Sequence, residues 1–233
     1  NSETGIKQNI NELGEFLKQY PKCFFHVDMT QAIGKINISL ENVDLASFSA
    51  HKIYGLKGIG VLYKRKNIEL VPLIHGGKST TIYRSGTPAL PLIVSMAKAL
   101  RLALDNLDSK YEKVLNLNEY LKDNLSKFEH VRINSNNNSI PHVLNISVLG
   151  VKPETMQHAL EESDIYISTQ TACSSSTTVS KAVLALTKDK DRASSSVRIS
   201  LSHLTTKEEI EEFKKIFDSC IKELEQNGKI SRD

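Results

Sequence analysis

The chain has 233 residues, 39% of them hydrophobic and 24% charged, which is the size and composition of a globular protein with one large or two small domains. Its 30 basic and 27 acidic residues leave a formal net charge of +3, and this small excess argues against nucleic acid as a partner. No apolar run approaches the roughly eighteen residues that a membrane-spanning helix requires, so we predict no interaction with a membrane.

The first hundred residues alternate a helical pattern with short β-rich runs. Residues 10–17 carry apolar side chains at helical spacing. Apolar runs at residues 23–27, 45–49 and 58–63 predict strands, and the first of them is expected to be buried. Strands separated by helices are typical of an α/β sheet, in which ligands bind beyond the ends of the strands.

A long helical pattern follows over residues 90–125 and is interrupted by the polar stretch 105–110. We place a domain boundary there, which gives domains of residues 1–108 and 109–233. The apolar face of the first part of this pattern is predicted to consist of Ile93, Met96, Ala97, Leu100 and Leu104.

The remainder of the chain is predicted to form a smaller α/β domain. Residues 143–148 and 197–201 have the pattern of strands, and Pro153 opens a helix that runs through Leu160. In the last helix, Thr206 and Glu209 have the spacing of a capping box. An apolar stripe follows, made of Ile210, Phe213, Phe217, Cys220, Ile221 and Leu224.

Two groups of polar residues directly follow predicted strands. Asp28 ends the first apolar run, where it is either a surface turn residue or a site carboxylate. The sequence Ser49-Ala50-His51-Lys52 ends the second. If the extended backbone continues, Ser49 and His51 alternate about Ala50 and can bind one oxyanion, with Lys52 pointing elsewhere. The simpler interpretation of this sequence is a solvated loop.

Ordered motifs extend over nearly the whole chain. They are His26–Gln31, Ser47–Gly60, Arg84–Thr87, Ala172-Cys173, Ser196–Leu201 and Thr205–Glu209. Together they resemble the signature of cysteine desulfurases of the NifS/IscS type, which belong to the class V aminotransferase branch of the fold-type I pyridoxal-phosphate enzymes. The resemblance implies an α/β fold in which residues 1–108 are the C-terminal part of the large mixed-sheet domain, followed by the small C-terminal α/β domain.

The resemblance also implies a cofactor, pyridoxal 5'-phosphate. Lys52 corresponds to the lysine that binds the cofactor aldehyde as a Schiff base, and Asp28 to the carboxylate that pairs with the pyridine nitrogen. A carboxylate at that position keeps the nitrogen protonated, which makes the ring a better electron sink. Gln31 corresponds to the residue that contacts the ring hydroxyl.

The phosphate of the cofactor is expected to bind Ser49 and His51. Thr87 is expected to reach the phosphate from the other subunit of a homodimer.

Cys173 matches the cysteine that forms a persulfide in this family, and Arg198 matches the arginine that binds the substrate carboxylate. The polar stretch 168–180 around Cys173 is expected to be an exposed, mobile loop. Cys23 and Cys220 lie in apolar patterns and are expected to be buried and inert. Three cysteines without a Cys-x-x-Cys pair predict a reducing, cytoplasmic location and no structural zinc site.

The implied activity converts L-cysteine to L-alanine and passes the sulfur, through a persulfide, to an acceptor protein for iron–sulfur clusters or tRNA thiolation. Family members have a longer N-terminal part, and that part holds a histidine and a loop that contact the cofactor. We therefore expect this chain to be truncated, to bind the cofactor weakly or not at all by itself, and to lack activity alone. Ser2 occupies the position of a family asparagine beside the cofactor. The alternatives are a related transaminase or selenocysteine lyase, or a folded fragment without catalysis.

Overall fold

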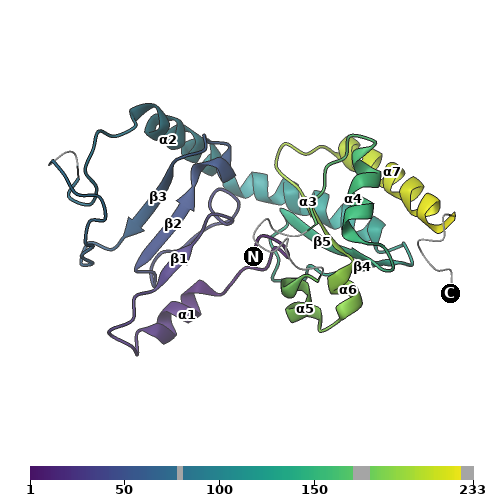
Figure 1. The fold of residues 1–233 in the computed structure, drawn as a ribbon, viewed down its shortest axis with the longest axis horizontal. Coiled ribbons are helices and arrows are strands. Elements are labelled where there is room, and N and C mark those ends of the chain that lie inside the picture. The colour runs from purple at the N-terminus through teal and green to yellow at the C-terminus, as the bar shows by residue number, and fades with distance from the viewer. Residues whose placement is uncertain (78–80, 170–178, 227–233) are drawn as a thin grey trace. The chain divides into compact units, whose positions relative to one another are not determined.

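The structure is a computed structural model that describes residues 1–77, 81–169 and 179–226 (Figure 1). It divides into two compact units. The first unit consists of residues 9–108, and the second unit combines residues 1–8 with residues 109–233. None of the helices among the described residues is both long enough and apolar enough to cross a membrane.

The first unit is built on a sheet of three strands in the order β1-β2-β3 (Figure 1). Strand β1 spans His26–Asp28, β2 spans Leu45–Ser49 and β3 spans Gly60–Lys64. Strand β1 runs parallel to β2, and β3 runs antiparallel to β2. Helices α1 (Ile10–Leu17) and α2 (Leu90–Leu104) and the short 3₁₀ helix η1 (Ala50–Ile53) complete it.

One face of this sheet carries the core of the first unit. Ala46 and Phe48 are buried and alternate with half-buried neighbours along β2, as expected for a strand with one buried face. Helix α2 is buried at Ala99 and Ala103. The predicted apolar face is confirmed at Leu100, which packs against the core, but is wrong at Ile93 and Leu104, which are 38% and 45% exposed. Small residues are buried here because the backbone approaches closely, and a Cβ at Gly34 would lie 2.7 Å from that of Ala103.

The first apolar run also differs from its prediction. Strand β1 begins at His26, whereas Cys23 is exposed and Phe24 is 64% exposed. The Cys23 amide donates to the carbonyl of Tyr20 in a turn, which keeps this part of the run out of the sheet. The expectation that Cys23 is buried is therefore wrong.

The second unit has an antiparallel sheet in the order β4-β5-β6. Its strands are Val131–Ile133, Val143–Val148 and Ser196–Ser200. Its long helices are α3 (Leu107–Leu125), which begins at the boundary, and α7 (Lys207–Gln226). Shorter helices are α4 (Pro153–Glu161), α5 (Lys181–Thr187) and α6 (Lys190–Ser194).

The central strand of this sheet is buried on both faces, because every residue of β5 is buried. Leu144, Ile146 and Val148 belong to an apolar core that includes α3, α4 and α7. All six residues of the predicted stripe on α7 are buried, and Thr206 and Glu209 form the predicted capping box. Cys220 is buried as expected.

The opposite face of β5 is polar. Asn145 and Ser147 are fully buried there, and Asn134 Nδ2 donates to both, at 2.7 Å each. Asn145 Nδ2 donates in turn to the carbonyl oxygen of Glu3 at 3.0 Å. This contact and the backbone hydrogen bonds of Gly5 and Lys7 with residues 138–140 explain why residues 1–8 pack with residues 109–233, whereas the sequence placed them in the first domain.

Candidate functional site

Asp28 and Ser49 end two neighbouring parallel strands of the first unit. The register pairs Asp28 with Ser47, so the carboxyl ends of β1 and β2 lie at the same edge of the sheet. Neighbouring strands are about 4.8 Å apart, which places Asp28 and the end of β2 within reach of one small ligand. We call Asp28, Gln31, Ser49, His51 and Lys52 the edge group.

Two members of the edge group hold hydrogen bonds of their own. Asp28 is exposed, and its Oδ1 accepts a hydrogen bond from the amide of Thr30 at 2.9 Å. This is the geometry expected if Asp28 is a surface turn residue. Gln31 is half-buried, and its Oε1 accepts from Nζ of Lys35 at 2.9 Å. An ammonium group can only donate, so the Gln31 amide must turn its oxygen to Lys35 and keep its NH₂ end for an acceptor.

The expected alternation of Ser49 and His51 about Ala50 is wrong. Residues Ala50–Ile53 form the 3₁₀ helix η1, which ends at Tyr54 in the left-handed conformation with φ 64°. Strand β2 cannot continue because the chain turns here, with the Ala50 amide bonded to the carbonyl of Ile59. The turn leaves both His51 and Lys52 exposed at the end of the strand.

Thr87 is exposed in the loop that precedes α2, directly after Gly86. Within the residues that the structure describes, no hydrogen bond joins Thr87 to the edge group. Its predicted partner is the phosphate bound by the other subunit, a role that does not require such a contact.

Arg198 lies in the second unit, on strand β6, and is half-buried. Its Nη1 donates to the carbonyl oxygen of Ser2 at 2.9 Å, and its Nη2 donates to Oγ of Ser168 at 3.0 Å. The buried Nε has no hydrogen-bond partner among the described residues. Burial lowers the pKa of the Arg198 guanidinium, and the charge of Glu3 opposes this shift. Arg198 is therefore a cation whose orientation is fixed by two hydrogen bonds, and its guanidinium retains N–H donors that can bind an anion.

Cys173 and most of the stretch 168–180 lie outside the described residues. The two ends of this stretch are described. Ser168 exchanges backbone hydrogen bonds with Arg198, at 3.1 and 2.6 Å. Ser180 is fully buried at the N-cap of α5, where its Oγ accepts from the amide of Val183 at 3.0 Å.

Glu3 is a buried residue that was not among the predicted site residues. Its side chain is 4% exposed, and Oγ of Ser180 donates to its Oε1. A single acidic residue in a polar segment is normally solvated, so composition gives no signal for such burial.

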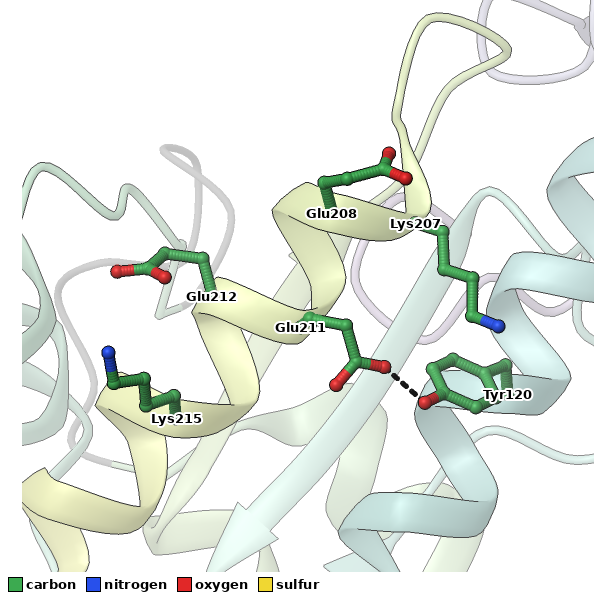
Figure 2. A pocket seen from close by; sticks show the side chains of 6 residues that line it. All are labelled: Tyr120, Lys207, Glu208, Glu211, Glu212 and Lys215. Atoms are coloured by element: carbon green, nitrogen blue, oxygen red, sulfur yellow. Dashed lines mark hydrogen bonds between the residues drawn. The ribbon is translucent and has the colours of Figure 1, made fainter.

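A shallow pocket in the second unit is unrelated to the predicted residues (Figure 2). The Tyr120 hydroxyl donates to Glu211, and Lys207 Nζ lies 4.9 Å from the centre of the Tyr120 ring. The other residues that line it are Glu208, Glu212 and Lys215. These side chains of both signs lie along more than two turns of α7 and form a solvated surface, and we assign no site to it.

Comparisons with known proteins agree with this description. The model of the aminotransferase class-V family matches residues 1–213. The chain is 39% identical over 224 residues to a NifS/IcsS protein homolog from Lactobacillus delbrueckii, covering 94% of this chain and 58% of that protein. It is 41% identical over 217 residues to cysteine desulfurase IscS from Buchnera aphidicola, covering 91% of this chain and 53% of that protein.

The fold is similar as well. The solved structure of a NifS-like protein from Rickettsia africae matches with a TM-score of 0.84 and 31% identity, covering 95% of this chain and 60% of that one. The chain therefore spans somewhat more than half the length of the relatives that it matches. Its two α/β units correspond to part of the fold of a NifS-like protein, and the chain belongs to the aminotransferase class-V family.

Proposed function

We propose that this chain is the C-terminal part of a pyridoxal-phosphate-dependent cysteine desulfurase, which converts L-cysteine to L-alanine and keeps the sulfur on an enzyme thiol. The observation that carries the proposal is the edge group, which gathers the side chains of Asp28, Ser49, His51 and Lys52 at the ends of two parallel strands. The relatives named cysteine desulfurase support the same reaction.

The edge group fits the cofactor chemically. The exposed Lys52 amine suits the aldehyde, and the exposed Asp28 carboxylate suits the ring nitrogen. The Gln31 amide, held by Lys35, offers its NH₂ end to the ring hydroxyl. Ser49 and His51 would hold the phosphate, together with Thr87 from a second subunit.

When bound, pyridoxal phosphate supplies an electron sink for a substrate that is losing a proton. Asp28 holds the proton on the ring nitrogen, and the Lys52 amine moves the proton at the substrate α-carbon. Arg198 binds the substrate carboxylate, which an arginine fork can do through two parallel hydrogen bonds.

Cys173 is proposed as the residue that accepts the sulfur. Its thiolate attacks the sulfur of the substrate, an S–S bond forms, and the bond between this sulfur and the substrate β-carbon breaks. The electron pair of that bond stays with carbon, which takes up a proton to give alanine, and the enzyme retains a persulfide.

The test uses the whole protein, with L-cysteine as substrate and alanine and persulfide as measured products. Replacing Lys52 with Ala should abolish alanine formation, whereas the matched control Lys57→Ala should retain it. Cys173→Ser should abolish the persulfide but keep the absorbance of the lysine-bound cofactor. Persulfide formation by Cys173→Ser, or alanine formation by Lys52→Ala, contradicts the assignment.

The same assay separates the alternatives. A transaminase releases keto acid and no sulfide or persulfide, and a selenocysteine lyase acts on selenocysteine in preference to cysteine. If this chain has no catalytic role, the whole protein forms no alanine, keto acid, sulfide or persulfide.

We further propose that the whole protein is a cytoplasmic homodimer that delivers sulfur to an acceptor protein. We expect the chain by itself to bind pyridoxal phosphate weakly or not at all, since it spans little more than half of its relatives. Titrating this chain with the cofactor and recording the absorbance of the lysine imine measures the affinity. A strong band that disappears in Lys52→Ala refutes the expectation of weak binding.

A further inference from the structure

Glu3 is a buried carboxylate for which the proposed reaction gives no role. It is 4% exposed, and its Oε1 accepts a hydrogen bond from Oγ of Ser180. Removing a carboxylate from water is costly unless hydrogen bonds and an opposite charge compensate it. A neutral residue at this position would avoid that cost, so the charge itself requires an explanation.

Glu3 is linked to a cation through its neighbour Ser2, whose carbonyl oxygen accepts from Nη1 of Arg198 at 2.9 Å. The charge of Glu3 favours the cationic form of Arg198, although no ion pair within 4.0 Å joins the two side chains among the described residues. The Arg198 guanidinium instead donates to the Ser2 carbonyl oxygen and to Oγ of Ser168. Glu3 therefore stabilises the cation without occupying its donors, and the buried Nε has no partner of its own among the residues described.

The same two residues hold Ser168 and Ser180, which lie on either side of residues 170–178. Ser168 pairs with the backbone and the side chain of Arg198. Ser180 binds the Glu3 carboxylate and caps α5 through the amide of Val183. Glu3 and Arg198 thus fix both flanks of the stretch that contains Cys173.

We propose that Glu3 is a positioning residue, which acts as the fixed counter-charge of Arg198 and so holds this guanidinium ready for the carboxylate of an amino acid substrate. This inference rests on the proposed function for the identity of the substrate. Without the carboxylate, a half-buried guanidinium is less well compensated and gains by turning toward water. Its remaining donors then no longer face one fixed direction, and substrate affinity falls.

The first experiment measures the pairing in this chain and needs no cofactor. The urea midpoint of unfolding is determined for Glu3→Gln, for Arg198→Met and for the double variant. Glutamine keeps the size of the side chain and an oxygen for Ser180 but removes the charge. We expect Glu3→Gln to lower the midpoint clearly in the presence of Arg198, and to have little effect or to raise the midpoint when residue 198 is Met.

Two controls accompany this double-mutant cycle of Glu3→Gln and Arg198→Met. Glu154→Gln removes an exposed carboxylate in the first turn of α4 and should lower the midpoint only slightly, through the loss of a favourable charge at a helix N-terminus. Ser180→Ala removes the hydrogen bond but neither charge, so the coupling between positions 3 and 198 should persist in it. Additive effects of Glu3→Gln and Arg198→Met overturn the inference, whether or not the protein is a desulfurase. If Glu3→Gln alone does not fold, recovery of folding in the double variant supports the pairing, and failure of both overturns it.

The second experiment measures KM and kcat for L-cysteine in the whole protein. Because Glu3 acts on the group that binds the substrate carboxylate, Glu3→Gln should raise KM about tenfold and change kcat much less. Glu154→Gln should change neither constant. An unchanged KM in Glu3→Gln overturns the positioning role. A wild-type protein that does not act on cysteine contradicts the proposed function, while the unfolding cycle still decides the pairing.

Discussion

Replacing Asn145 with Ala tests why the first eight residues belong to the second unit. Asn145 is fully buried on β5. Its Nδ2 donates to the carbonyl oxygen of Glu3 at 3.0 Å, and its Oδ1 accepts from Nδ2 of Asn134 at 2.7 Å. Alanine provides neither group, so two buried polar groups lose a partner in the variant.

The expected cost follows from these two contacts. A buried group left without its hydrogen bond costs about 1–3 kcal/mol, so two such groups cost about 2–6 kcal/mol. Asn134 retains its bond to Ser147, and water can reach the Glu3 carbonyl once the segment loosens, so we expect the lower half of this range. The predicted loss in the free energy of unfolding is about 3 kcal/mol.

Urea denaturation followed by circular dichroism measures this loss, and Asn137→Ala is the matched control. Asn137 is exposed, so its replacement should change stability by no more than about 0.5 kcal/mol. Hydrogen exchange adds a local measurement at the amide of Ile140, which donates to the carbonyl oxygen of Gly5 at 2.9 Å. This amide should exchange faster in Asn145→Ala. A variant as stable as the control, with unchanged exchange at Ile140, refutes the reasoning.

Three further predictions concern reactivity and packing. Burial raises the pKa of the Cys220 thiol and so lowers its thiolate fraction. In a Cys173→Ser background, iodoacetamide at neutral pH should alkylate the exposed Cys23 at least about tenfold faster than the buried Cys220. Similar rates for the two thiols would contradict the burial of Cys220. Thr206→Ala should lower the free energy of unfolding by about 1 kcal/mol in urea titrations, because it loses the bond from the Glu209 amide at 3.2 Å, whereas Thr206→Ser should stay near wild type. Phe217→Ala should cost about 3–5 kcal/mol by the same method because the ring is fully buried, whereas Leu204→Ala, at 63% exposure, should cost about 0.5 kcal/mol or less; equal losses would refute the packing.

The sequence predicted best the elements whose stability depends on local rules. The capping box at Thr206 and Glu209 and the stripe on α7 depend on contacts three or four residues apart, which the sequence displays directly. The ends of β1 and β2 were located in the same way, because a polar residue after an apolar run indicates where a strand stops. The same pattern makes Asp28 and Lys52 candidates for a site, and the resemblance to the cysteine desulfurases gives them their predicted roles.

Predictions failed where the partner of a residue is distant in the chain. The buried side of α2 is set by close approach to Gly34, so Ala99 and Ala103 are buried in place of the larger side chains. The turn at Ala50 depends on the hydrogen bond that its amide donates to the carbonyl oxygen of Ile59, which alternation along β2 could not indicate.

By itself, the sequence determined the α/β class, the positions of most helices and strands, and the residue types that suit an aldehyde cofactor and an amino acid. Only the tertiary structure decided that the first eight residues belong with the second unit, and that Glu3 is buried and bonded to Ser180, 177 positions away. The physical reason is that the contribution of a charge or an amide to the free energy of folding depends on its surroundings in the folded protein. Burial strengthens electrostatic interactions and penalises unpaired groups, and the sequence does not show which groups the fold will bury together.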